Sequence, residues 1–149
     1  MQDRFHTFTV QIAKIARAIR RIKAEETEEL HLKGTHVSCL YYLYKEERGM
    51  TATELCEACD EDKAAVSRSV EYLEEYGYVA CKSEKQKRWK SLLVLTDKGR
   101  EAGRRIADKI DCILAQASEG LTEENRLIFY QSLKLISDNL QKICEKYGE

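Results

Sequence analysis

The segment KSEKQKRWKS, residues 82–91, is strongly basic. Between Lys82 and Lys90 it carries five cations and one carboxylate, Glu84, together with the only tryptophan, Trp89. Such a cluster suits contact with a polyanion such as a nucleic-acid backbone, where each cation releases bound counterions. The alternative is a solvated surface loop without a partner. Because the whole chain has a net charge of −1, nucleic-acid binding would depend on local rather than bulk charge.

Cysteine and histidine residues offer a second kind of chemistry. Cys56 and Cys59 form a CxxC pair, and His36 and Cys39 stand three residues apart with His31 five residues earlier. Redox CxxC pairs usually follow a strand and open a helix, and a zinc site usually needs a second pair at matched spacing. Neither feature accompanies these residues. We therefore interpret the cysteines as reduced and structural, and we expect no metal and no cofactor.

No catalytic motif is present. The sequence lacks a Gly-rich phosphate loop, an HExxH and a GxSxG, and none of its three histidines stands near a suitable nucleophile and acid. We therefore expect a protein that is not an enzyme.

The composition is that of an ordinary helical protein. A chain of 149 residues that is 43% hydrophobic can form one domain with a core, and the absence of proline favours long helices. The first 30 residues interleave apolar and charged side chains, so they do not form a secretory signal. The longest apolar run, CLYYLY, is far below the roughly 18 residues that a membrane span needs. These features predict a soluble, cytoplasmic protein without a membrane partner.

Apolar seams at both ends of the chain indicate long helices that pack on other helices. Their apolar residues recur at alternating steps of three and four, a period of 3.5. The N-terminal seam is Phe5, Phe8, Ile12, Ile15, Ile19 and Ile22, and the C-terminal seam is Phe129, Leu133, Ile136, Leu140, Ile143 and Tyr147. Packing within one chain is the alternative, but the middle of the chain is too short to cover both. We therefore predict a homodimer built from residues 1–32 and 97–149.

Residues 35–96 have the pattern of a winged helix-turn-helix. ATELCEAC and DKAAVSRSVEYLEEYG indicate two short helices, and Thr51 with Glu54 fits a capping box at the start of the first. YVACKS and SLLVL are β-prone segments on either side of the basic residues, which predicts a β-hairpin with its wing at 82–91. Thr35, Thr96 and Thr122 are expected to open further helices. Gly49, Gly77 and Gly120 are expected to end them.

The two faces of the second short helix differ in character. Val66, Val70 and Leu73 fall at i, i+4 and i+7 and can pack on the first helix. The opposite face offers a hydroxyl at Ser67 and a guanidinium at Arg68. A hydroxyl can contact phosphate, and an arginine can pair with O6 and N7 of guanine.

These residues resemble the DNA-binding core of the multiple antibiotic resistance regulator (MarR) family. The stretch GMTATELCEACDEDKAAVSRSVEYLEEYGYVACK, followed by LLVLTDKGRE, matches four family motifs in order. They are Thr51, Glu54 and Leu55; Asp62, Lys63, Val66, Ser67 and Arg68; Leu73, Glu74 and Gly77; and Leu95, Thr96 and Gly99. The resemblance implies a dimeric regulator that places a recognition helix in the major groove and a wing in the minor groove.

Two features depart from the family pattern. Where the wing usually carries Asp-x-Arg, this chain has Lys87 and Trp89, so Arg88 or Lys90 would have to contact the minor groove. Where the turn between the two helices usually has Gly and an apolar residue, this chain has Asp60 and Glu61. Their negative charge would lie close to the DNA phosphates, which opposes tight non-specific binding.

Taken with the resemblance, the sequence predicts a mainly α fold with a small β-hairpin, in a single domain of residues 1–149. The function that we expect is a homodimeric repressor that binds a pseudo-palindromic double-stranded operator and is released by a small-molecule effector. The alternative is a winged-helix dimer that binds proteins or small molecules and has little affinity for DNA. The expected DNA contacts are Thr51, Thr53, Lys63, Ala64, Ala65, Ser67, Arg68, Lys85, Lys87, Arg88 and Lys90, and the expected ligand-pocket residues are His36, Tyr41 and Tyr44.

Overall fold

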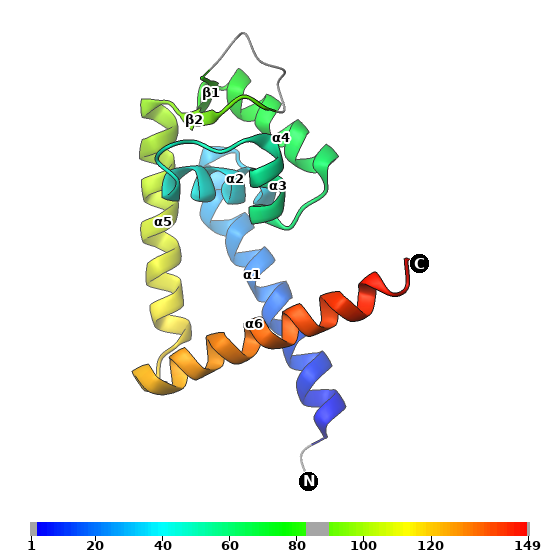
Figure 1. Cartoon of the computed structure of the whole chain (residues 1–149). Coiled ribbons are helices and arrows are strands. Elements are labelled where there is room, and N and C mark those ends of the chain that lie inside the picture. Colours follow the sequence, from blue (N-terminus) through cyan, green and yellow to red (C-terminus); the bar gives the residue numbers. More distant parts are fainter. Residues whose placement is uncertain (1–2, 83–89, 149) are drawn as a thin grey trace. The chain divides into compact units, whose positions relative to one another are not determined.

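Six α-helices and one two-stranded antiparallel sheet make up the residues that the structure, a computed structural model, describes: 3–82 and 90–148 (Figure 1). The mainly helical fold with a small hairpin is therefore confirmed. The chain divides into two compact units, Met1–Lys109 and Ile110–Glu149. No helix in the described part of the chain is both long and apolar enough to cross a membrane.

The first unit contains most of the elements. A π-helical turn, His6–Val10, leads into α1, Gln11–Thr27, which ends in a 3₁₀ turn, Glu28–Leu30. Three helices follow, α2 (Gly34–Lys45), α3 (Ala52–Cys59) and α4 (Lys63–Glu75). The strands β1 (Val79–Cys81) and β2 (Leu93–Leu95) precede α5 (Asp97–Ala117), whose last residues belong to the second unit.

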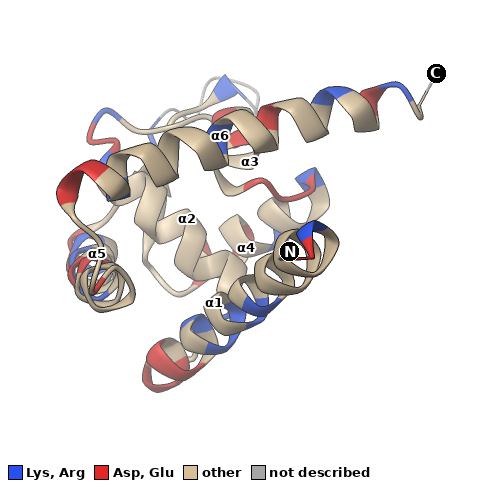
Figure 2. Ribbon diagram, turned by 90° about the horizontal axis from the view of Figure 1, so that it is seen from below, with Lys and Arg blue, Asp and Glu red and all other residues tan. Residues whose placement is uncertain are grey.

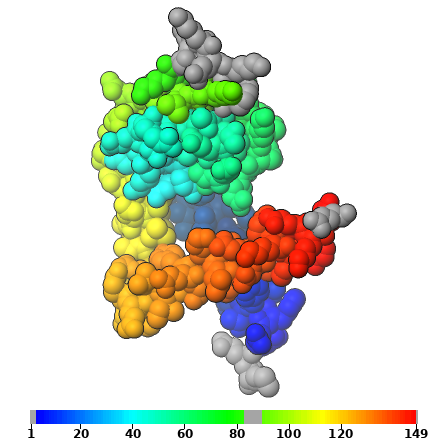
Figure 3. All heavy atoms as spheres, viewed as in Figure 1, coloured from blue at the N-terminus to red at the C-terminus, as the bar shows by residue number. Residues whose placement is uncertain are grey.

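The core of the first unit lies among α2, α3, α4 and the hairpin. Leu40, Leu55, Leu73 and Leu93 come from these four elements, and each is at most 1% exposed. In the space-filling view, the segments coloured cyan to green, which include α2 to α4, form one continuous packed body (Figure 3). The core therefore holds the helix-turn-helix and the base of the wing together.

Residues of α3 differ from expectation in their burial. The sequence predicts Cys56 and Cys59 as buried structural cysteines, but both are half-exposed. Leu55 is the residue of α3 that is fully buried. Cys59 lies one turn further on the same face of α3, but it is the last residue of the helix and is only partly covered. Cys39 on α2 is buried.

The hairpin is tied to the rest of the unit at two points. Val79 pairs with Leu95 and Cys81 with Leu93, in antiparallel register, and Met50 forms a further bridge to Leu93. Thr96, immediately after β2, donates its hydroxyl to the carbonyl of Gly77 at 2.5 Å and accepts from the backbone N–H of Gly99 at 3.1 Å. Thr96 therefore caps α5, as predicted, and also connects it to the end of α4.

The start of α2 differs from the prediction. Lys33, not Thr35, occupies the N-cap position, and its backbone N–H donates to Nδ1 of His36 at 3.0 Å. The His36 ring is buried and stacks on Tyr72 of α4, with centroids 4.3 Å apart. Burial, and then the charge of Lys33, lowers the pKa of His36 from its ordinary value of 6.5. A neutral imidazole suits this position, because protonation of Nδ1 would remove the acceptor that caps the helix.

The ends of the chain carry the predicted seams. In the first unit, Phe5, Ile15 and Ile19 are 74%, 53% and 49% exposed. Figure 2 shows basic residues along α1 and acidic residues at its C-terminal end. In the second unit, Thr122 caps α6, Glu123–Glu145, by accepting from the N–H of Asn125 at 3.2 Å. No residue of α6 is buried, and its seam residues are among the exposed ones.

Candidate nucleic-acid interface

Helix α4 is fixed at its start by a side-chain cap. Oδ1 of Asp62 accepts a hydrogen bond from the backbone N–H of Ala65 at 2.7 Å. The preceding turn is closed by Asp60, whose φ of 50° lies in the left-handed region. The N–H groups of Asp60 and Glu61 donate back to carbonyls of α3. These bonds set the position of α4 relative to α3.

The two faces of α4 are divided as the sequence predicts. Val66, Val70 and Leu73 are buried, together with Ser69. Five predicted DNA contacts lie on this helix. Ala65 is half-buried, and the other four are exposed: Lys63, Ala64, Ser67 and Arg68. Lys63 lies at the first turn and Arg68 more than one turn later, so that a cation, a hydroxyl and a guanidinium occur along one surface-facing helix.

Two predicted contacts lie at the start of α3. Thr51 Oγ1 accepts from the N–H of Glu54 at 3.2 Å, and a Glu54 carboxylate oxygen accepts from the N–H of Thr51 at 2.8 Å. The capping box is thereby confirmed. The bond from the Thr51 backbone, followed by the charge of Arg48, lowers the pKa of the Glu54 carboxyl. Thr53 is exposed, and the Thr51 hydroxyl still has its own proton to donate to a phosphate.

Acidic side chains surround the turn between α3 and α4. Four of them are exposed close to Lys63, the first residue of α4: Glu57, Asp60, Glu61 and Asp62. A helix N-terminus normally favours an anion such as phosphate. Here the nearby carboxylates oppose that attraction and weaken any contact that lacks specific hydrogen bonds.

We expect Asp60→Gly to stabilise the protein and to tighten DNA binding together. Glycine adopts a positive φ without the steric conflict that Cβ creates, so the free energy of unfolding should rise by about 0.5–1 kcal/mol. Removal of the charge should also raise the affinity for DNA. Asp60→Asn is the matched control, because asparagine tolerates the same conformation but carries no charge. It should reproduce the gain in affinity and not the gain in stability, as measured by urea unfolding and by DNA titration. Lower stability of the glycine variant would contradict the account of this turn.

Of the four predicted wing contacts, Lys90 belongs to the described residues. Lys85, Lys87 and Arg88 lie outside the described residues. Lys90 is exposed, and the adjacent Ser91 is buried at the base of the hairpin. On the other strand, the N–H of Lys82 donates to the carbonyl of Leu92 at 2.8 Å. The described part of the hairpin thus continues to both ends of the basic segment.

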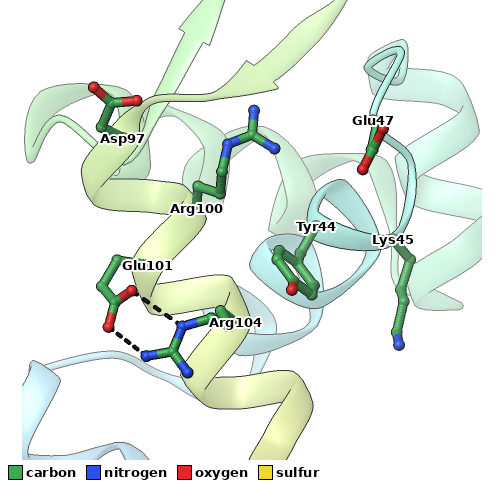
Figure 4. A pocket seen from close by; sticks show the side chains of 7 residues that line it. All are labelled: Tyr44, Lys45, Glu47, Asp97, Arg100, Glu101 and Arg104. Carbon is green, nitrogen blue, oxygen red and sulfur yellow. Dashed lines mark hydrogen bonds and ion pairs between the residues drawn. The ribbon is translucent and has the colours of Figure 1, made fainter.

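A cavity of about 560 Å³ lies between the end of α2 and the start of α5 (Figure 4). Among the predicted pocket residues, Tyr44 lines it, whereas His36 stacks on Tyr72, and Tyr41 lies against Tyr42 and Lys45. Arg104 is held by Glu101 at 2.7 Å and by Asp108 at 3.0 Å. The remaining lining residues are Lys45, Glu47, Asp97 and Arg100.

Sequence reasoning missed the arginines of this cavity. Arg100 and Arg104 follow the Leu-Thr-x-x-Gly motif at a spacing of four, which places them on one face of α5. That spacing is the signal that could have identified them. The charges around Tyr44 make the cavity polar, with cations and carboxylates close together.

Comparison with known proteins identifies relatives of this fold. Residues 32–88 match the MarR family model. A MarR family transcriptional regulator from Listeria monocytogenes, solved with a 26mer DNA, is 28% identical, with a TM-score of 0.76 over 94% of this chain and 90% of that chain. A search of curated proteins found no match.

Two further solved structures are similar over nearly their whole length. A MarR family regulator from Neisseria meningitidis is 16% identical, with a TM-score of 0.82, and the match covers 97% of this chain and 99% of that chain. Staphylococcus aureus MepR, solved in complex with DNA, is 17% identical, with a TM-score of 0.80 and coverage of 93% and 99%. At these identities the similarity is one of fold.

Proposed function

We propose that this chain, whose residues 32–88 match the MarR family model, is a transcription regulator of that family and acts as a homodimeric repressor on a pseudo-palindromic operator. Each protomer places α4 in the major groove and its wing beside the adjacent minor groove. The two half-sites lie about one helical turn of DNA apart, as the symmetry of a dimer requires.

The exposed face of α4 is the observation that carries this proposal. The apolar residues of α4 on the opposite face are buried in the core, whereas Lys63, Ser67 and Arg68 are exposed. Arg68 then reads a guanine through two hydrogen bonds, and Ser67 and Lys63 hold phosphates. Ala64 and Ala65 are small enough to approach a thymine methyl. At the start of α3, Thr51 and Thr53 contact the phosphate backbone of the DNA. The cations of the wing are Lys85, Lys87, Arg88 and Lys90.

The exposed seams support a dimer. Monomeric proteins rarely leave large apolar surfaces in contact with water. In the first unit, α1 has three isoleucines that are each more than 40% exposed: Ile12, Ile15 and Ile19. In the second unit, α6 has three apolar residues exposed to the same degree: Leu133, Leu140 and Ile143. A second copy of the chain would cover both sets, so we assign residues 1–32 and 97–149 to dimerisation and 35–96 to DNA binding.

The cavity beside Tyr44 is the candidate site for a releasing ligand. Staphylococcus aureus MarR has been solved in complex with salicylate and kanamycin. In this chain, Lys45 and Arg100 offer positive charge beside the aromatic ring of Tyr44, an arrangement that suits a small aromatic anion. The cavity lies between the end of α2 and the start of α5. A ligand there would therefore contact both the region that we assign to DNA binding and the region that we assign to dimerisation.

A second function remains in competition with this one. The exposed carboxylates of Glu57, Asp60 and Glu61 favour a winged-helix dimer that binds proteins or small molecules and has little affinity for DNA. Neither function involves catalysis.

A salt titration separates the two functions. If each protomer neutralises about three phosphates, the logarithm of the binding constant should fall against the logarithm of salt concentration with a slope near −5. The measurement uses the purified protein and a duplex selected from random sequences. A slope near zero, or no binding below micromolar concentration at low salt, would contradict DNA binding and favour the second function.

A further inference from the structure

Two cysteines from different helices lie next to each other in the helix-turn-helix. Sγ of Cys39 on α2 and Sγ of Cys59 on α3 are 4.0 Å apart, although 20 residues separate them in the chain. Cys39 is completely buried, whereas Cys59 is half-exposed. A solvent-accessible thiol therefore lies directly against a thiol that solvent does not reach. No group of three or more His, Cys, Asp or Glu side chains in the described ranges could hold a metal ion.

We propose that Cys39 and Cys59 form a reversible disulfide that joins α2 to α3 when a hydroperoxide oxidises Cys59. A disulfide requires the two sulfurs to approach to about 2.05 Å. From the observed separation this is a movement of about 2 Å, which a side-chain rotation and a small shift of the eight-residue α3 can supply together.

The reaction occurs in two balanced steps. The Cys59 thiolate attacks one oxygen of hydrogen peroxide; an S–O bond forms, the O–O bond breaks and hydroxide leaves, giving a sulfenic acid. The Cys39 sulfur then attacks the Cys59 sulfur; the S–S bond forms, the S–O bond breaks and, with the proton of Cys39, water leaves. The two thiols lose two electrons, and one peroxide molecule becomes two molecules of water.

The surroundings assign the first step to Cys59. The hydrogen bond from Cys39 lowers the pKa of the Cys59 thiol, and the nearby Lys23 acts in the same direction, while partial burial and Glu61 oppose them. The same hydrogen bond, followed by burial, raises the pKa of Cys39. Thiolate character and access favour reaction with peroxide, and Cys59 has more of both. Cys39 then serves as the resolving thiol, already in contact.

Cys56 is the competing partner within the CxxC pair. Residues three apart on a helix have Cβ atoms about 5–6 Å apart, whereas a disulfide needs Cβ atoms roughly 3.5–4.5 Å apart. A bond between Cys56 and Cys59 would therefore require the end of α3 to unwind. The contact with Cys39 requires no unwinding, which favours the pairing between helices.

The bond would act at the turn that positions α4. Cys59 is the last residue of α3, and Asp60 and Asp62, which close the turn and cap α4, follow directly. Moving Cys59 toward α2 moves the start of the recognition helix with it. If the proposed DNA-binding function holds, oxidation should weaken binding to the selected duplex by about tenfold or more, since specific contacts tolerate only small displacements.

Disulfide mapping tests the bond without reference to DNA. The full chain is treated with hydrogen peroxide, free thiols are blocked with iodoacetamide, and the digest is analysed by mass spectrometry. We expect a Cys39–Cys59 peptide pair that dithiothreitol separates. A variant with Cys81, Cys112 and Cys144, the three exposed cysteines, replaced by serine should form the same bond, and Cys59→Ser should not. Because Cys39 is buried, Cys59→Ser is preferred to a change at Cys39.

The outcomes distinguish the bond from the proposed function. A Cys56–Cys59 pair, or oxidation confined to the exposed cysteines, would overturn the proposal. If the Cys39–Cys59 disulfide forms but the reduced protein binds no DNA, the disulfide is supported and the DNA-binding function is refuted. If the reduced protein binds DNA, oxidation should weaken binding in the wild type and not in Cys59→Ser. Equal affinity of the oxidised and reduced wild type would refute the effect on the helix-turn-helix.

Discussion

Replacement of Arg68 by alanine should abolish the sequence preference of the protein while leaving it folded. Arg68 is exposed on α4, opposite the buried Val66 and Val70, so its removal leaves the core intact. A bidentate contact between arginine and guanine discriminates against other bases by about 1–3 kcal/mol, or roughly 5- to 150-fold. Affinity for the selected duplex should fall to that for random DNA, as measured by fluorescence anisotropy with both duplexes.

Two control variants separate reading of bases from attraction of phosphates. Arg68→Lys retains the charge but cannot form the paired hydrogen bonds, so it should lose preference with a smaller loss of total affinity. Lys63→Ala, also exposed on α4, and Lys85→Ala in the wing should weaken binding to all sequences alike. Each should reduce the magnitude of the salt slope by about two, because each substitution removes one phosphate contact from each protomer. If Arg68→Ala lost the same factor on selected and random DNA, its role as a base reader would be refuted.

Replacement of Gly99 by alanine should have the largest effect on stability. A Cβ at this position would lie 1.9 Å from the carbonyl oxygen of Tyr78 and 2.9 Å from its carbonyl carbon. Both atoms belong to the backbone next to β1, so they cannot rotate away as a side chain could. We expect the free energy of unfolding to fall by about 3 kcal/mol or more, measured as a lower urea midpoint.

Gly34→Ala is the matched control for Gly99→Ala. Gly34 is also in the first turn of a helix, and a Cβ there would meet nothing within 4 Å. Since alanine is the better helix former, this variant should be neutral or slightly more stable. Gly103→Ala should be intermediate, because its Cβ would come within 2.8 Å of the Tyr44 side chain. Equal stability of Gly99→Ala and wild type would contradict the close packing of α5 on the strand.

Local features of this fold could be predicted well from the sequence. The capping box at Thr51, the cap at Thr122, and the positive φ of Gly49, Gly77 and Gly120 all depend on residues a few positions apart. The division of α4 into a buried and an exposed face also follows from spacing along one helix. Such features are decided by short-range sterics and hydrogen bonds, which the sequence states directly.

Features that depend on contacts between distant segments were not predicted. The cap at Lys33 depends on His36, whose ring is held against Tyr72 of another helix. The pairing of Cys39 with Cys59 requires α2 and α3 to be packed together. Tyr44 was expected to line a pocket, but Arg100 and Arg104 join it there only because α5 is placed beside α2. Each of these is set by tertiary packing, which the local pattern does not specify.

The wing and the acidic turn are the two places where this chain departs from the family pattern for DNA binding. Lys87 and Trp89, which occupy the positions of the usual Asp-x-Arg, lie outside the described residues. The contact with the minor groove that we expect of Arg88 or Lys90 stays a prediction. Asp60 takes the left-handed conformation that glycine would adopt more easily, and it adds a negative charge there. We therefore expect binding to depend more on the contacts of α4 with the bases than on general attraction to the DNA phosphates.

Selection from a pool of random duplexes tests the central claim most directly, because one experiment reports the partner, the symmetry and the spacing together. The purified full chain is incubated with the pool, and the bound fragments are sequenced after successive rounds. The account predicts an inverted repeat whose half-sites are centred about one helical turn apart, as for two recognition helices on one face of the duplex. Recovery of no enriched sequence, or of a single half-site without symmetry, would contradict a homodimer that reads DNA through α4.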